Sequence, residues 1–267
     1  MKKSLSIIAS IMLTGAVLSA CGNNSDTEKS ASTADKKENV ELTVSAAASL
    51  QDALTDLKKQ YESEHKNVTI TYNFGGSGDL QQQISQGAPV DLFFSAAEDK
   101  FDTLVDEGEI EKNDGVDLLA NDLVLVTPTE NKKDIQSFDD LTKADKVALG
   151  TPESVPAGQY GVETLKSIDV WTKIKSNVVY AKDVRQVLTY TETNNVDAGI
   201  VYKTDALTSD KVKIVATADD ESHTPIIYPV GIIKDSKHAT EAKEFYTFLQ
   251  SDDAMKVYKD YGFKGAK

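Results

Sequence analysis

The 267-residue chain has few of the residues from which metal and catalytic sites are usually built. It contains one cysteine and three histidines. A single cysteine excludes a disulfide within the chain. The histidines, His65, His223 and His238, lie at no metal-ligand spacing, so no zinc site is expected. No Ser-His-Asp or Cys-His arrangement and no Walker-type phosphate loop is readable in the sequence, so its motifs predict no enzyme.

The chain also lacks an excess of positive charge. Its formal net charge is −14, with 29 Lys and Arg against 43 Asp and Glu. Nucleic acid is therefore not an expected partner, because phosphate backbones select basic surfaces. The hydrophobic content of 40% and charged content of 27% are typical of a water-soluble globular protein. This length is enough for two compact lobes, each with its own core.

The only long apolar run lies at the N-terminus and is short for a membrane span. It covers residues 7–20, follows the basic start Met1-Lys2-Lys3, and ends in Leu18-Ser19-Ala20-Cys21. This ending resembles the lipobox of bacterial lipoproteins. Residues 1–20 are therefore predicted to be a lipoprotein signal peptide, with a lipid on Cys21 that anchors the chain to the membrane. The alternative is an ordinary signal peptide with an incidental cysteine.

Beyond this leader, the sequence first predicts a flexible tether and then an α/β fold. Residues 21–40 are polar, without apolar periodicity. From Glu41 onwards, short apolar runs with strand character alternate with amphipathic helical segments. Such alternation favours mostly parallel sheets flanked by helices.

The order of these segments predicts two lobes joined by a hinge, with a cleft between them. Residues 41–120 and 230–267 are expected to form lobe 1, and residues 121–229 lobe 2. The chain is expected to cross between the lobes near 121–127 and 224–233.

Five short turns stand at or just before the start of a helix. A helix start exposes unpaired backbone N–H groups and the positive end of the helix dipole. If the turns meet at one point, they form an uncharged cage for a small anion. The turns are Ala47-Ala48-Ser49, Gly75-Gly76-Ser77-Gly78, Val155-Pro156-Ala157-Gly158, Asp183-Val184-Arg185 and Val201-Tyr202.

Each candidate in these turns also has a structural interpretation. Ser49 and Ser77 are either donors to an anion or simple helix N-caps. Asp183 is expected to cap its own helix and leave the Val184 N–H free. Tyr202 either donates its phenol proton or only lines the cleft.

Two further residues are weighed with the same chemistry in mind. Ala157 is small enough to let a ligand approach its N–H group, or else merely belongs to a Pro-initiated helix. Arg185 is expected to be structural, because a buried arginine–oxyanion pair is hard to desolvate and release.

The motifs that carry these turns, taken together, resemble the periplasmic molybdate-binding proteins of ABC importers. The resemblance runs in order over about residues 41–264. The matching motifs are Val44-Ser45-Ala46-Ala47-Ala48-Ser49-Leu50, Phe74-Gly75-Gly76-Ser77-Gly78, Gln86-Gly87-Ala88-Pro89-Val90-Asp91-Leu92-Phe93, Val155-Pro156-Ala157-Gly158-Gln159-Tyr160, Asp183-Val184-Arg185, Ala198-Gly199-Ile200-Val201-Tyr202 and Tyr261-Gly262-Phe263.

This resemblance implies a two-lobe type II periplasmic-binding-protein fold and a transport function. Molybdate or tungstate would be held between the lobes by neutral hydrogen bonds and delivered to a membrane permease. The resemblance implies no cofactor, no direct metal ligand, a monomer, and a location outside the cytoplasm. The implied contacts to the oxyanion are the hydroxyls of Ser49 and Ser77, the N–H groups of Ala157 and Val184, and the hydroxyl of Tyr202.

One residue departs from the family pattern, and three alternatives stay open. Asp79 stands where many relatives carry an uncharged residue; we expect its carboxylate to point away from the cleft. The alternatives are a binder of sulfate, phosphate or another small solute, the effector domain of a transcription factor, and an anchored hydrolase. The lipobox and the lack of a basic helix-turn-helix argue against the second.

Overall fold

The computed structural model describes residues 38–266. The predicted signal peptide, the lipid site Cys21 and the tether up to residue 37 lie outside this range. Val40 already pairs with Val68, so the first strand begins one residue before the expected Glu41. Within residues 38–266, no helix has both the length and the apolar character needed to cross a membrane.

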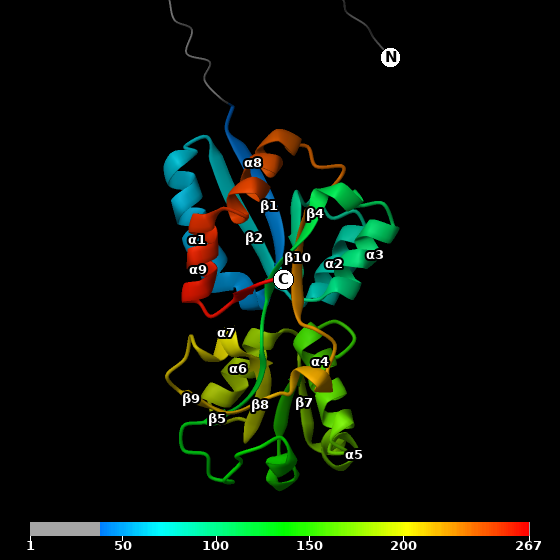
Figure 1. Ribbon diagram of the computed structural model, residues 1–267, viewed down its shortest axis with the longest axis vertical. Helices are drawn as coiled ribbons and strands as arrows, with labels where there is room; N and C mark the ends of the chain where they lie inside the picture. The colour runs from blue at the N-terminus through cyan, green and yellow to red at the C-terminus, as the bar shows by residue number, and fades with distance from the viewer. Residues whose placement is uncertain (1–37, 267) are drawn as a thin grey trace, which may run out of the picture. The chain divides into compact units, whose positions relative to one another are not determined.

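The described chain forms two β-sheets, each flanked by helices (Figure 1). The first sheet has the strand order β11-β4-β10-β3-β1-β2, and the second the order β7-β6-β8-β5-β9. The strands are β1 (Val40–Ala47), β2 (Val68–Gly75), β3 (Leu92–Phe94), β4 (Gly115–Ala120), β5 (Leu123–Pro128), β6 (Val147–Gly150), β7 (Val178–Ala181), β8 (Ala198–Tyr202), β9 (Val212–Thr217), β10 (Ile227–Ile232) and β11 (Lys264–Gly265). We call the part built on the first sheet the first lobe, and the part built on the second sheet the second lobe.

The helices follow the strands in the alternation that the sequence predicts. They are α1 (Gln51–Glu64), α2 (Ser77–Ser85), α3 (Glu98–Asp106), α4 (Pro156–Ser167), α5 (Trp171–Ile174), α6 (Val184–Glu192), α7 (Lys203–Ala206), α8 (Ala239–Leu249) and α9 (Asp252–Asp260). Short 3-10 helices also occur between these elements and the strands; the one that matters for the site is η1 (Ala48–Leu50), directly before α1.

Both sheets are mixed, whereas the sequence predicts mostly parallel sheets. In the first sheet β1 runs parallel to β2 and β3, but β10 runs antiparallel to β3 and β4. In the second, β6 is parallel to β7 and β8, and β5 is antiparallel to β8 and β9. A helical crossover returns a strand parallel to its predecessor. β5 and β10 instead arrive directly from the other sheet, so they enter in the opposite direction.

Side-chain alternation along β3 distributes the core of the first lobe over two faces. Leu92 and Phe94 join the large core under α1, α8 and α9, whereas Phe93 joins a smaller cluster with α2 and α3. Successive side chains of a strand point to opposite faces, so this apolar run is buried on both sides.

The second sheet is covered in the same way by α4 and α6. A Cβ placed on Gly199 of β8 would lie 2.5 Å from the Thr191 hydroxyl of α6. A Cβ on Gly161 of α4 would approach Ile200, the next residue of β8, at 3.3 Å. Neighbouring residues of one strand thus face different helices, which places α4 and α6 on opposite faces.

The chain passes between the two sheets in two short segments (Figure 1). β4 of the first sheet ends at Ala120, and β5 of the second begins at Leu123. The return runs from the end of β9 at Thr217 to the start of β10 at Ile227. The strands β4 and β11 were not predicted from the sequence.

Candidate functional site

The structure brings all five predicted contact residues to one small cavity between the lobes. The cavity has a volume of about 10 Å³. This is about the space that one water molecule needs. It is lined by Ala47, Ala48, Ser49, Gly75, Gly76, Ser77, Ala96, Val155, Pro156, Ala157, Val184 and Tyr202.

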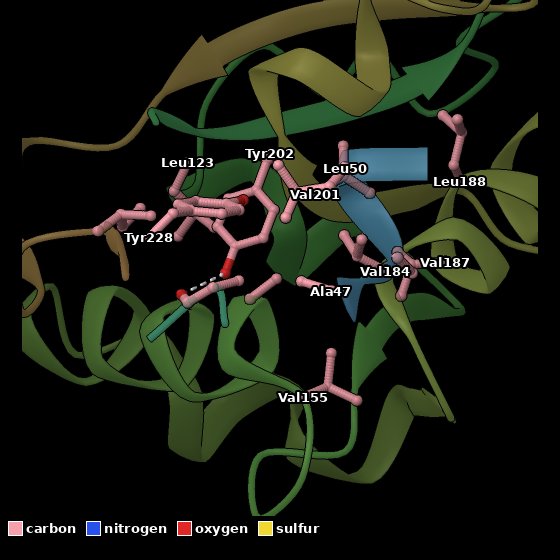
Figure 2. Close-up of a cluster of buried hydrophobic side chains, with 14 of the residues drawn as sticks. Ala47, Leu50, Leu123, Val155, Val184, Val187, Leu188, Val201, Tyr202 and Tyr228 are labelled. Atoms are coloured by element: carbon pink, nitrogen blue, oxygen red, sulfur yellow. Dashed lines mark hydrogen bonds between the residues drawn. The ribbon is translucent and has the colours of Figure 1, made fainter. Parts of the chain in front are cut away.

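The cavity offers hydrogen-bond donors but no formal charge. Among the described residues that line it there is no Asp, Glu, Lys, Arg or His. All five predicted contact residues are buried, with at most 4% of their surface exposed. Ala47, Val155, Val184 and Tyr202 surround this space from different elements (Figure 2). Water is therefore largely kept out, which strengthens any hydrogen bond made inside.

Ser77 is held so that its hydroxyl proton is free to be donated. It is the first residue of α2, and the N-cap is Gly76. Its Oγ accepts the backbone N–H of Ala96 at 2.9 Å. A hydroxyl that accepts a hydrogen bond still has its own proton to donate. The interpretation of Ser77 as an N-cap is therefore wrong.

Ser49 is also not an N-cap, so this interpretation of Ser49 is wrong as well. It lies inside η1, and α1 begins two residues later at Gln51. Its Oγ lies 2.9 Å from the hydroxyl of Tyr228, which comes from β10. This serine is thus part of a buried polar pair whose second member lies far along the chain.

The start of α4 contributes the backbone of Ala157. Pro156 occupies the first turn, where its missing N–H group costs nothing. A Cβ on Gly158 would lie only 2.0 Å from the Gly150 carbonyl oxygen, so glycine allows α4 to begin directly against the end of β6. The N–H groups of the first helical turn have no partner inside their own helix, and the Ala157 N–H is one of them.

The start of α6 confirms the predicted role of Asp183 as a helix cap. Its carboxylate accepts the N–H of Gln186 at 2.8 Å. Val184 is the first residue of the helix, so its own N–H has no intrahelical acceptor. The Val184 N–H thus remains available at the cavity.

Tyr202 ends β8, and its phenol lies close to the first lobe. Its hydroxyl is 3.5 Å from the Ala96 carbonyl oxygen, at the outer limit of a hydrogen bond. Burial raises the pKa of Tyr202 well above its usual value, so the phenol keeps its proton. The side chain can therefore serve as a donor.

Arg185 is engaged away from the cavity. Its guanidinium contacts Asp52 of α1 across the lobes, lies 3.0 Å from a carboxylate oxygen of Asp205, and donates to Thr208 at 2.8 Å. Neither Arg185 nor the half-buried Asp79 lines the cavity. Both placements agree with the roles expected from the sequence.

A larger depression next to Arg185 is less suited to an anion. It measures about 650 Å³ and carries the carboxylates of Asp52, Glu192 and Asp260. Three acidic groups disfavour a negatively charged ligand by direct repulsion. In residues 38–266 there is also no group of three or more His, Cys, Asp or Glu side chains that could hold a metal ion.

Sequence reasoning missed three residues that support the site. Ala96 follows β3 and contacts both Ser77 and Tyr202 through its backbone. Its position after a central parallel strand is a usable signal, because such strand ends meet at one edge of the sheet. Tyr228 and Asn121 lie behind Ser49 and carry no comparable signal in the sequence.

Comparison with known proteins decides the family. Residues 42–264 match the bacterial extracellular solute-binding protein family. The chain belongs to this family. Its relatives in these comparisons are solute-binding proteins of transporters, not enzymes, and this chain is accordingly a solute-binding protein.

The individual relatives cover nearly the whole chain. A Bacillus subtilis (strain 168) protein, provisionally named as an ABC transporter substrate-binding lipoprotein, is 54% identical over 98% of this chain and 99% of its own. The molybdate-binding protein ModA of Escherichia coli (strain K12) is 38% identical over 83% of this chain and 88% of its own. The periplasmic molybdate-binding protein of Azotobacter vinelandii covers 85% of this chain and 100% of its own, with a TM-score of 0.75 and 22% identity. This last likeness establishes the two-lobe α/β fold.

Proposed function

We propose that this solute-binding protein captures molybdate or tungstate between its lobes and delivers it to the membrane permease of an ABC importer. The observation that carries the proposal is the neutral cavity in which donors from both lobes converge. The proposed contacts are the Ser49, Ser77 and Tyr202 hydroxyls and the Ala157 and Val184 N–H groups. Relatives named for molybdate binding support the choice of ligand.

The chemistry of the cavity fits a fully deprotonated tetrahedral dianion. Every proposed contact is a donor, and helix starts add favourable dipoles without a counter-ion. An anion that carries a proton, such as hydrogen phosphate, needs an acceptor that these groups do not supply. Molybdate is larger than sulfate, so we expect the size of the cage to separate these two oxyanions.

The proposed cycle uses the two lobes as a clamp. An open cleft admits the anion, hydrogen bonds from both lobes draw it closed, and the closed form docks on the permease. Lipid on Cys21 would keep the protein at the outer surface of the membrane. We expect the protein to act there as a monomer. Neutral contacts suit such a cycle, since the ligand must also be released.

Thermal melting with a panel of tetrahedral anions tests the proposal. A ligand that binds only the folded state raises the melting temperature, and at equal concentration a tighter ligand raises it more. Molybdate and tungstate are expected to give large shifts, and sulfate and phosphate small ones. Equal shifts for all four, or a shift with sulfate alone, would contradict the proposed ligand.

Replacing Ser77 tests the proposed contacts. Hydrogen bonds to a charged group contribute about 1.5–3 kcal/mol, so Ser77→Ala should weaken molybdate binding about 10- to 100-fold in calorimetry. Ser45→Ala is the matched control, because Ser45 is a fully buried β1 serine whose hydroxyl has no hydrogen-bond partner within the described residues. Equal affinity of the two variants would remove Ser77 from the site.

A further inference from the structure

We propose that Asn121 and Tyr228 are positioning residues that force the Ser49 hydroxyl to act as a donor towards the bound oxyanion. They do so through a directed chain of hydrogen bonds, Asn121 to Tyr228 to Ser49. The inference rests on the proposed function, because it assigns a role to residues behind that anion site. Neither residue lines the cavity itself.

The chain starts at the side-chain amide of Asn121, whose orientation is fixed. Its Oδ1 accepts the backbone N–H of Asp122 at 2.9 Å. The amide nitrogen therefore points the other way, where it meets the hydroxyls of Thr204 at 2.9 Å and Tyr228 at 3.1 Å. Both protons of the amide are thus used, one for each hydroxyl.

This orientation decides the direction of the next hydrogen bond. The Tyr228 hydroxyl accepts from Asn121, so its single proton is available to the Ser49 Oγ at 2.9 Å; the Tyr202 hydroxyl also lies near Tyr228. Tyr228 is completely buried, and burial raises the pKa of its phenol well above the usual value. The phenol therefore stays protonated, and the donor in this pair is Tyr228.

The last step places the Ser49 proton in the cavity. Since Ser49 accepts from Tyr228, its own proton must find another acceptor. Ser49 lines the cavity, where a bound oxyanion would supply that acceptor. Ser77 is polarised in the same sense by the Ala96 N–H. Both serines are thereby set as donors before any ligand arrives, which lowers the cost of reorganisation on binding.

The residues of this hydrogen-bond chain lie at both crossings between the lobes. Asn121 lies between β4 and β5, and Tyr228 lies on β10 just after the return. Thr204, the second acceptor of the Asn121 amide, belongs to α7 of the second lobe. The residues that orient Ser49 are therefore held from both lobes.

The first experiment measures anion binding by Tyr228→Phe. Without the phenol, Ser49 is free to turn its lone pairs towards the ligand. Molybdate affinity is expected to fall about 3- to 10-fold, the range of one modest hydrogen bond. Discrimination against hydrogen phosphate should narrow as well, because Ser49 is then able to accept its proton. The quantity compared is the ratio of the affinity for molybdate to the affinity for hydrogen phosphate. If Tyr228 had a purely structural role, its replacement would not lower this ratio.

Tyr258→Phe is the matched control. Tyr258 is also fully buried, and its hydroxyl has no hydrogen-bond partner among the residues that the structure describes. Tyr258→Phe removes a phenol hydroxyl from a fully buried position, as Tyr228→Phe does. Molybdate affinity and the phosphate ratio should equal those of the wild type.

The second experiment uses Asn121→Asp to reverse the donor–acceptor direction of the hydrogen bonds that run through Tyr228 to Ser49. A carboxylate accepts from Tyr228, so Tyr228 would accept from Ser49 and turn the Ser49 lone pairs towards the anion. Molybdate affinity is expected to fall further than in Tyr228→Phe. Adding Tyr228→Phe to Asn121→Asp should then restore part of the affinity, because the reversed link is cut. A loss caused only by the added charge would not be restored.

The outcomes separate this inference from the proposed function. The proposal stands if Tyr228→Phe narrows the ratio and the double variant binds more tightly than Asn121→Asp; any other combination overturns it. The wild-type titration tests the function independently. If the wild type prefers tungstate or sulfate, the same comparisons are made with that anion. A wild type that binds none of these anions overturns both.

Discussion

At the scale of single residues, Asp205 is an acidic residue in an unfavourable environment. Its carboxylate is fully buried, and desolvation raises its pKa to about 7 although Arg185 acts in the opposite direction. Arg185 thus lies beside this carboxylate and does not line the cavity. The folded state holds a proton on Asp205 at pH values where the unfolded chain has already lost it.

This raised pKa predicts a pH dependence of stability that Asp205→Asn should remove. Between about pH 4 and 7 the folded state binds more protons than the unfolded state, so the Asp205 contribution to stability falls as the pH rises. The free energy of unfolding of Asp205→Asn, relative to that of the wild type, should therefore rise by about 1–4 kcal/mol when the pH is raised from 4.5 to 7.5. Urea unfolding of both proteins at the two pH values measures this. A difference independent of pH would show that the Asp205 pKa is not raised.

At the scale of elements, the start of α2 fits tightly against the loop before α4. The Gly78 N–H donates to the Ser154 carbonyl oxygen at 2.9 Å, across the lobes. A Cβ on Gly78 would come within 2.7 Å of the Ser154 Cα, and one on Gly76 equally close to the Ser154 carbonyl. Small residues here allow two helix starts from different lobes to share one cavity.

Gly78→Ala should therefore hinder closure more than folding. The added methyl group meets backbone of the other lobe, which moves only if the lobes separate. We expect molybdate affinity to fall about 10-fold or more, with a loss of unfolding free energy below about 1.5 kcal/mol. Calorimetry and urea unfolding measure the two effects. Gly265→Ala is the control, since its Cβ would meet only the Met255 side chain, at 3.6 Å. Unchanged affinity of Gly78→Ala would contradict this role.

At the scale of the whole described unit, the lobes are joined by contacts around the cavity. Arg185 of α6 reaches Asp52 of α1, and Tyr202 of β8 approaches Ala96 after β3. These contacts connect the two sheets independently of the crossings. Because Arg185 is also paired with Asp205 in its own lobe, its position for Asp52 is fixed in advance.

The pair between Arg185 and Asp52 should stabilise the closed arrangement modestly. A partly exposed ion pair contributes up to about 1 kcal/mol, so Asp52→Asn should weaken molybdate binding up to about 5-fold at low salt. The difference in affinity between Asp52→Asn and the wild type should shrink at 0.5 M salt, where the Debye length falls to about 4 Å.

The matched control for this prediction is Asp253→Asn. It removes the same charge from a pair that lies within α9, with Lys256. Calorimetry at two salt concentrations compares the variants. Equal behaviour of Asp52→Asn and Asp253→Asn would show that the interlobe pair has no role in binding.

The sequence by itself determined most of the helices and strands and the places where an anion could be held. Local signals suffice for this, because helix starts depend on nearby residues such as Pro156 and Asp183. The five predicted contact residues do share one cavity. Their role in binding an anion is still a prediction, and so are the expected lobe boundaries.

Only the tertiary structure decided how the donors are oriented and how the sheets are assembled. Ser49 and Tyr228 are 179 residues apart, and no local pattern joins them. The mixed sheets depend on β5 and β10 arriving from the other lobe, which periodicity cannot show. Strand direction and the partners of a buried hydroxyl are set by packing between distant segments, since a buried polar group must be satisfied by whatever the fold places beside it.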